Sequence, residues 1–147
     1  MSDSLFIPIA RIPSDLEEAK TAIIQGLAEL AEPAPEIRYR TAQSGTHDLE
    51  RGQMEVYGRS PYDACRVSFY GLEFSAREPD ESDLAFVASV LTRRNSWFAG
   101  AVAFGLAMNF GGRVVYDDSL MLHGTDRYRV QILGRILKEG LQGERRF

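Results

Sequence analysis

The chain has 147 residues, of which 44% are hydrophobic and 26% are charged, and this composition excludes an intrinsically disordered, a collagen-like and a membrane-spanning protein. A chain of this length folds as one domain that buries its own hydrophobic core, so we expect a single domain over residues 1–147. The 17 basic and 21 acidic residues give a net charge of −4, which disfavours nucleic acids and anionic membranes as partners.

The use of cysteine and the first residues of the chain indicate its compartment. Cys65 is the one cysteine, so no disulfide can form within the chain and a cysteine-rich zinc site is excluded. The sequence MSDSLFIPIARIPSD at the start has no basic segment, and its apolar run is too short for a secretory signal peptide. We therefore expect a cytoplasmic protein.

The first elements along the chain are a strand and a helix. Residues 6–12 are apolar and β-branched, and Pro8 within them places the predicted strand at the edge of a sheet. Ser14 and Glu17 have the spacing of a capping box, in which each side chain bonds a free backbone N–H of the other residue. Apolar residues then recur at helical spacing, which predicts an amphipathic helix over residues 15–31.

Three segments with alternating apolar and polar residues follow. They predict strands over residues 36–41, 53–57 and 65–74, joined by short connections that favour an antiparallel meander. In the third strand the alternation places Cys65 on the same face as other apolar residues, and Gly71 suggests a bulge or bend.

The second half of the chain has a more helical pattern. Asp80 is suited to cap a helix that extends to Arg94, because acidic residues begin the segment and arginines end it. A second helix over residues 97–110 carries no charge and is too short to span a bilayer, so we expect it to be buried in the core. Gly111 and Gly112 are suited to end this helix.

A short strand over residues 113–116 and a final helix over residues 126–139, ended by Gly140, complete the prediction. The element order is then β-α-β-β-β-α-α-β-α. Early strands and later helices indicate an α+β fold, with helices packed on one face of a mostly antiparallel sheet.

Few side chains are suited to nucleophilic or metal chemistry. Cys65 could act as a nucleophile only with His47 or His123, and its place in an alternating strand favours a buried structural thiol. Asp117, Asp118 and His123 could bind a divalent metal or act as acid and base. The preferred interpretation of this group is a turn after a strand, where aspartate bonds its own backbone.

Motifs that hold nucleotides, zinc or an activated serine are absent. The chain contains no GxGxxG after a strand, no GxxxxGK[ST], no HExxH, no GxSxG and no CxxC. We therefore expect no enzymatic activity, no cofactor and no metal.

The segment from Ala99 to Ser119 (AGAVAFGLAMNFGGRVVYDDS) consists of a small-residue helix, two glycines, a short apolar strand and an acidic turn. It resembles the C-terminal part of small bacterial immunity proteins, which neutralise the toxin domains of polymorphic or secretion-system effectors. The resemblance implies that the chain binds one cognate toxin and occludes its active site. A small acidic protein suits this function, because a basic toxin would be steered to it electrostatically.

We therefore predict an acidic binding surface in the two clusters that flank the central part of the sequence. Its predicted members are Asp117, Asp118, Glu78, Asp80, Glu81 and Asp83. The acidic residues from Glu78 to Asp83 are also a suitable helix start, and the sequence favours this structural role for them. Two alternatives remain open: a small enzyme or ligand-binding protein that uses Asp117, Asp118 and His123, and an adaptor or chaperone that docks an effector in an apolar groove.

Overall fold

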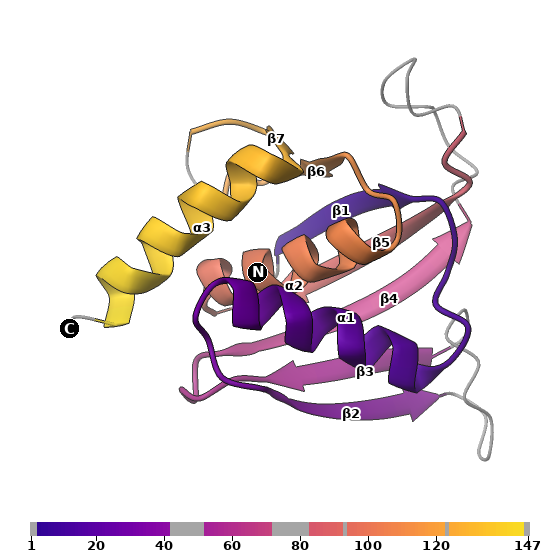
Figure 1. Ribbon diagram of the computed structural model, residues 1–147, viewed down its shortest axis with the longest axis horizontal. Helices are drawn as coiled ribbons and strands as arrows, with labels where there is room; N and C mark the ends of the chain where they lie inside the picture. The colour runs from indigo at the N-terminus through magenta and orange to yellow at the C-terminus, as the bar shows by residue number, and fades with distance from the viewer. Residues whose placement is uncertain (1–2, 42–51, 72–82, 93, 123, 146–147) are drawn as a thin grey trace.

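A computed structural model describes residues 3–41, 52–71, 83–92, 94–122 and 124–145. Within these residues a seven-stranded sheet forms one layer and three helices form the other (Figure 1). The strands are β1 (Asp3–Ile9), β2 (Glu36–Thr41), β3 (Gly52–Tyr57), β4 (Ala64–Gly71), β5 (Phe86–Thr92), β6 (Val114–Tyr116) and β7 (Arg127–Arg129). The helices are α1 (Leu16–Glu29), α2 (Ser96–Asn109) and α3 (Val130–Arg145). The predicted α+β class, with helices on one face of an antiparallel sheet, is confirmed.

The strands have the order β2-β3-β4-β5-β1-β6-β7, and the recorded pairings between neighbours are antiparallel. Strands β2, β3 and β4 form the predicted meander. Strand β1 lies inside the sheet between β5 and β6, so its predicted edge position is wrong. The short β6 pairs with β1 at Phe6, and the Pro8 end of β1 pairs with β5 alone. Pro8 can therefore stand in an interior strand. It lies beyond the residue of β1 that pairs with β6, so its missing N–H removes no hydrogen bond to that strand.

The helix predicted up to Arg94 is wrong, because residues 86–92 form strand β5 in the middle of the sheet. Residues 80–82 of that prediction lie outside the described residues. The short apolar segment fits both a helical and an extended period, and length alone does not distinguish them. Val87 and Val90 favour the extended form, since β-branched side chains pack well on a pleated surface. Ala88 and Val90 are fully buried beneath the helices, as the partners of Ile7 and Leu5 in β1.

The ends of α1 and α3 also differ from prediction. Asp15 caps α1 by accepting a hydrogen bond from the Glu18 N–H at 2.8 Å, and the Glu18 carboxylate accepts one from the Ser14 N–H. The predicted N-cap is therefore shifted by one residue, and the return bond of Glu18 goes to the residue before the cap and not to the cap itself. Strand β7, which was not predicted, precedes α3, and α3 continues past Gly140 to Arg145. Gly140 faces the Trp97 ring, where a Cβ atom would lie 2.6 Å from the ring carbons.

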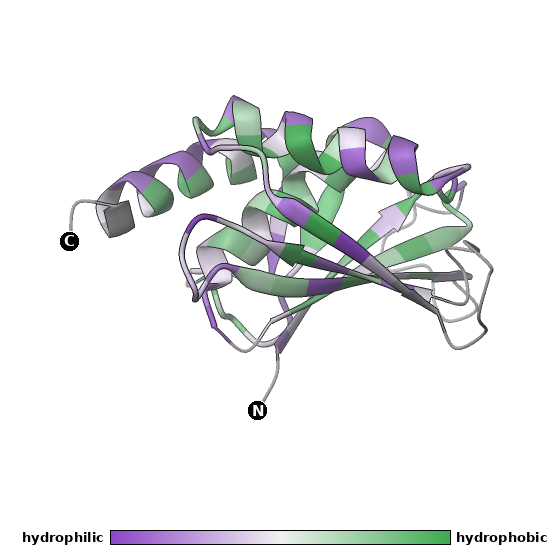
Figure 2. Cartoon of the chain, turned by 90° about the horizontal axis from the view of Figure 1, so that it is seen from below, coloured by the Kyte–Doolittle hydropathy of each residue, from purple (hydrophilic) through white to green (hydrophobic). Residues whose placement is uncertain are grey.

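Helix α2 lies in the centre of the helical layer and packs against α1, α3 and the sheet. Its residues from Phe98 to Ala107 are all buried, as the uncharged sequence predicted. Asn95 caps it, and Gly111 follows its end with φ +81°. Figure 2 shows the helices and the sheet as separate layers, with hydrophobic residues gathered where the two layers meet. None of the three described helices lies over the opposite face of the sheet, which we call the outer face.

Candidate functional site

Asp117, a predicted binding residue, lies at the end of β6 and is completely buried. Its two carboxylate oxygens accept hydrogen bonds from the backbone N–H groups of Met121 and Leu122, at 3.0 and 2.9 Å. Its own N–H donates to the carbonyl of Asp126 at 2.8 Å. Asp117 therefore organises the turn after β6, as the structural interpretation of the sequence stated, and it cannot belong to an exposed acidic surface.

Of the other predicted acidic residues, the structure describes Asp118 and Asp83. Asp118 is exposed beside Asp117. Asp83 is exposed and makes a two-pronged ion pair with Arg113, with distances of 3.0 and 2.7 Å. The hydrogen bonds from Arg113 hold the pKa of Asp83 below its usual value. Five further candidate residues lie outside the described residues: Glu78, Asp80, Glu81, His47 and His123.

Cys65 is buried on the helix-facing side of β4, as predicted. Burial raises the pKa of its thiol far above the ordinary value, and the nearby Asp63 carboxylate raises it further. A thiol with a raised pKa forms little of the thiolate that nucleophilic chemistry needs. This environment fits a structural cysteine.

The outer face of the sheet carries side chains from both neighbours of β4. The register places Arg66 of β4 between Glu55 of β3 and Leu91 of β5. In the next strand outward, Arg38 of β2 lies opposite Glu55. Because side chains alternate between faces along a strand, these residues share the outer face, whereas Cys65 and its alternate neighbours face the helices.

Aromatic rings and further arginines occupy other parts of the outer face. The guanidinium of Arg38 lies over the Tyr57 ring at 5.3 Å, and that of Arg127 lies over the Tyr116 ring at 5.8 Å. Tyr70 is 42% exposed. Tyr116 itself is only 2% exposed. The accessible part of the outer face therefore combines exposed arginines with Tyr70 and the half-buried Tyr57, and arginine and tyrosine are enriched at the energetic centres of protein interfaces.

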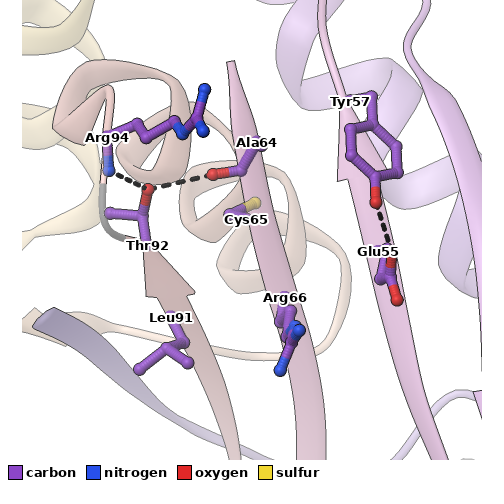
Figure 3. A pocket seen from close by; sticks show the side chains of 8 residues that line it. All are labelled: Glu55, Tyr57, Ala64, Cys65, Arg66, Leu91, Thr92 and Arg94. Carbon is purple, nitrogen blue, oxygen red and sulfur yellow. Dashed lines mark hydrogen bonds between the residues drawn. The ribbon is translucent and has the colours of Figure 1, made fainter. Parts of the chain in front are cut away.

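A pocket of about 240 Å³ opens on this face at the ends of β3, β4 and β5 (Figure 3). Its lining consists of Glu55, Tyr57, Ala64, Cys65, Arg66, Leu91, Thr92 and Arg94. The Tyr57 hydroxyl donates to the Glu55 carboxylate on one side, and the Thr92 hydroxyl donates to the Ala64 carbonyl at 2.9 Å on the other. Glu55 is 7% exposed although it lies on the sheet face that no described helix covers. The pocket thus has a polar wall, a strand floor and two cationic side chains.

The two arginines of the pocket have different surroundings. Arg94 donates to the Pro61 carbonyl at 3.2 Å and lies over the Tyr62 ring at 5.9 Å, so contacts with the β3–β4 turn hold it in place. Arg66 is exposed, and it makes no hydrogen bond, ion pair or ring contact with any described residue. Its five N–H donors are therefore available to a ligand or to water.

A buried polar pair fixes the position of this end of the sheet. The Asn95 side-chain amide donates to Asp63 at 2.7 Å, and its oxygen accepts from the N–H groups of Trp97 and Phe98 at the start of α2. Asp63 belongs to the turn between β3 and β4, so the pair ties that turn to α2. Arg94 precedes Asn95 directly and is held at the rim of the pocket as a result.

Other classes of site have no support in the described part of the chain. No three histidine, cysteine, aspartate or glutamate side chains there are grouped so that they could hold a metal ion. No helix there combines the length and the apolar character that are needed to cross a membrane.

Comparisons with protein-family models, with curated proteins and with solved structures gave no match to this chain.

Sequence reasoning missed the arginine pocket. The alternation in the β4 segment contains a signal, because Arg66 falls between Cys65 and Val67 and must point away from the core. No local pattern indicates that β5 pairs with β4, since that segment was predicted to be helical. Without this pairing, Arg66 and Arg94 cannot be assigned to one pocket.

Proposed function

We propose that this chain acts by binding another protein through the outer face of its sheet, and that the partner is a bacterial toxin which it neutralises. The observation that carries the proposal is the group of exposed arginines beside tyrosines and a pocket, on the sheet face that no described helix covers. The proposal that the partner is a toxin rests on the resemblance of the segment from Ala99 to Ser119 to immunity proteins. In this proposal the chain binds and occludes, and it converts no substrate.

The composition of the outer face supports a protein partner. Arginine and tyrosine supply large contact areas together with polar groups, and such residues carry much of the binding energy in protein interfaces. On this face Arg38 and Arg66 flank Glu55, so charges of both signs alternate across neighbouring strands. A partner surface whose charges alternate with the opposite signs would be complementary to the outer face. A partner with the same signs at these positions would be excluded by repulsion between like charges.

The surface proposed here replaces the acidic surface that the sequence predicted. Asp117 is buried in its turn, and Asp83 is paired with Arg113. Net charge still contributes at long range, because a chain with a charge of −4 attracts a basic partner before contact. The close contacts are then made by the arginines and aromatic residues of the outer face.

The test uses the protein encoded by the neighbouring gene. Expression of that protein alone should arrest growth, and co-expression of this chain should restore it. The two purified proteins should form a stable complex in size-exclusion chromatography and calorimetry. If the neighbour is not toxic, or if the pair forms no complex, the proposed function is wrong.

A matched pair of charge reversals tests the surface. Arg38→Glu changes the outer face, and Arg135→Glu changes an exposed residue of α3 in the helical layer. We expect Arg38→Glu to weaken the complex at least about tenfold, a loss of about 1.4 kcal/mol, while Arg135→Glu leaves affinity unchanged. Circular dichroism of both variants checks that the fold is retained. Equal affinity of Arg38→Glu and the unchanged chain would contradict the proposed surface.

A further inference from the structure

We propose that the pocket between β3, β4 and β5 receives a single carboxylate side chain, a glutamate or an aspartate of the partner protein, with Arg66 as its anchor. This inference rests on the proposed function and names the chemistry of the group that the outer face recognises. It follows from the charge, the size and the contacts of the pocket.

The charge of the described residues that line the pocket matches a monovalent anion. Its described lining contains two guanidinium groups, on Arg66 and Arg94, and one carboxylate, on Glu55. The formal sum is one positive charge, which a carboxylate neutralises and a phosphate dianion would exceed. The planar fork of an arginine also pairs with a carboxylate through two parallel hydrogen bonds.

The arginine that can make this pair is Arg66. Arg94 is already engaged by the Pro61 carbonyl and the Tyr62 ring, and it serves as one wall of the pocket. Arg66 has no partner among the described residues, and it lies on the central strand of the three that form the pocket. A carboxylate that enters the pocket would therefore replace water around Arg66 without breaking a recorded protein contact.

The size of the pocket suits one side chain. Its volume of about 240 Å³ lies below the range of roughly 300–1,000 Å³ that is typical of pockets for drug-sized ligands. Leu91 and Ala64 supply apolar surface beside the arginines, which suits the methylene stem of glutamate or aspartate. Anchor side chains that enter small pockets in this way are common at the centre of protein interfaces.

The experiment uses the full chain and two small probes, acetyl-glutamate methylamide and acetyl-glutamine methylamide, in amide NMR titrations. The two probes have the same shape and differ in charge. We expect the glutamate compound to shift the amide signals of Tyr57, Cys65 and Arg66, and the glutamine compound to bind at least about tenfold more weakly. Equal shifts from both probes, or no shift from either up to the solubility limit, would overturn the inference.

Two variants complete the test. Arg66→Ala should abolish the shifts caused by the glutamate probe, whereas Arg129→Ala, another exposed arginine on the outer face of the sheet, should leave them unchanged. Shifts that persist in Arg66→Ala would show that another group binds the probe. The titrations require no toxin, so a pocket that fails them while growth rescue succeeds refutes this inference alone. If the pocket binds the glutamate probe but growth rescue fails, the inference about the pocket stands and the proposed toxin partner is wrong.

Discussion

At the scale of single residues, the carboxylates of this chain have different roles because their surroundings differ. Asp117 is buried and bonded to backbone N–H groups, Glu18 forms an exposed ion pair, and Glu55 forms part of a pocket wall. In the sequence these residues carry the same functional group. Burial and partners decide which carboxylate shapes a turn and which one contacts the solvent.

Replacement of Asp117 by asparagine should destabilise the chain. The amide of asparagine would direct N–H donors towards a backbone N–H, so one buried donor would lose its acceptor. We expect a loss of about 1–3 kcal/mol in the free energy of unfolding, measured by urea denaturation. Asp126→Asn, at an exposed residue of the same turn, should change it by less than about 0.5 kcal/mol. Similar losses for both variants would contradict the structural role of Asp117.

Glu18 should make stability depend on pH in the acidic range. The side-chain hydrogen bonds from Arg11, followed by the Ser14 N–H, lower the pKa of Glu18 from 4.5 to about 2. A carboxylate whose pKa is lowered on folding stabilises the folded state above its unfolded pKa, and this contribution is lost as the pH falls. The Glu18 contribution is therefore complete above about pH 4.5 and disappears towards pH 2.

Thermal unfolding of Glu18→Gln measures this effect. We expect the variant to melt below the unchanged chain at neutral pH, and the difference to shrink as the pH falls from 4.5 to about 2. Glu17→Gln is the control, because the Glu17 side chain is 81% exposed. A melting difference that does not vary with pH would show that the Glu18 charge has no part in stability.

At the scale of elements, α1 and α2 cross in close contact. Gly26 and Gly105 meet there, and a Cβ atom on Gly26 would lie 2.4 Å from the Cα atom of Gly105. A Cβ atom on Gly105 would lie 2.5 Å from the Ala22 carbonyl oxygen. The obstacles are backbone atoms, so no side-chain movement can relieve the contact. No local pattern in the sequence shows which helix approaches α2 at this point.

Gly105→Ala should therefore force the two helices apart. We expect a loss of about 1–3 kcal/mol in the free energy of unfolding, as for overpacked cores. Gly143→Ala, in α3 and with no atom within 4 Å of the added Cβ, should instead stabilise by up to about 1 kcal/mol, since alanine favours helix formation. Urea denaturation measures both. A neutral result for Gly105→Ala would contradict the close crossing.

At the scale of the whole molecule, one hydrophobic cluster joins all three helices to the sheet. It includes Ile23 of α1, Val102 of α2, Leu137 of α3 and Val67 of β4. Because the layers share this core, no helix can leave without exposing the others. We infer that the described part of the chain unfolds as one cooperative unit.

The single tryptophan, Trp97, reports on the contact between α2 and α3, because it faces Gly140. Its fluorescence and the far-ultraviolet circular dichroism should give the same urea midpoint. Leu137→Ala should lower both midpoints together, with a loss of about 2–5 kcal/mol. Ile132→Ala, at a side chain of α3 that is 51% exposed, should have little effect. Separate midpoints would show that α3 unfolds independently.

The sequence by itself determined the α+β class, the helices α1 and α2, the first meander and the burial of Cys65. These features depend on local periodicity, on charge-free or alternating segments and on residues that end helices, all of which can be seen along the chain. Tertiary structure alone decided that residues 86–92 are a central strand and that β1 lies inside the sheet. It also decided that Asp117 is buried and that Arg66 and Arg94 border one pocket. The physical reason is that strand pairing joins residues far apart in sequence, so the partners of a side chain depend on contacts that no local pattern contains.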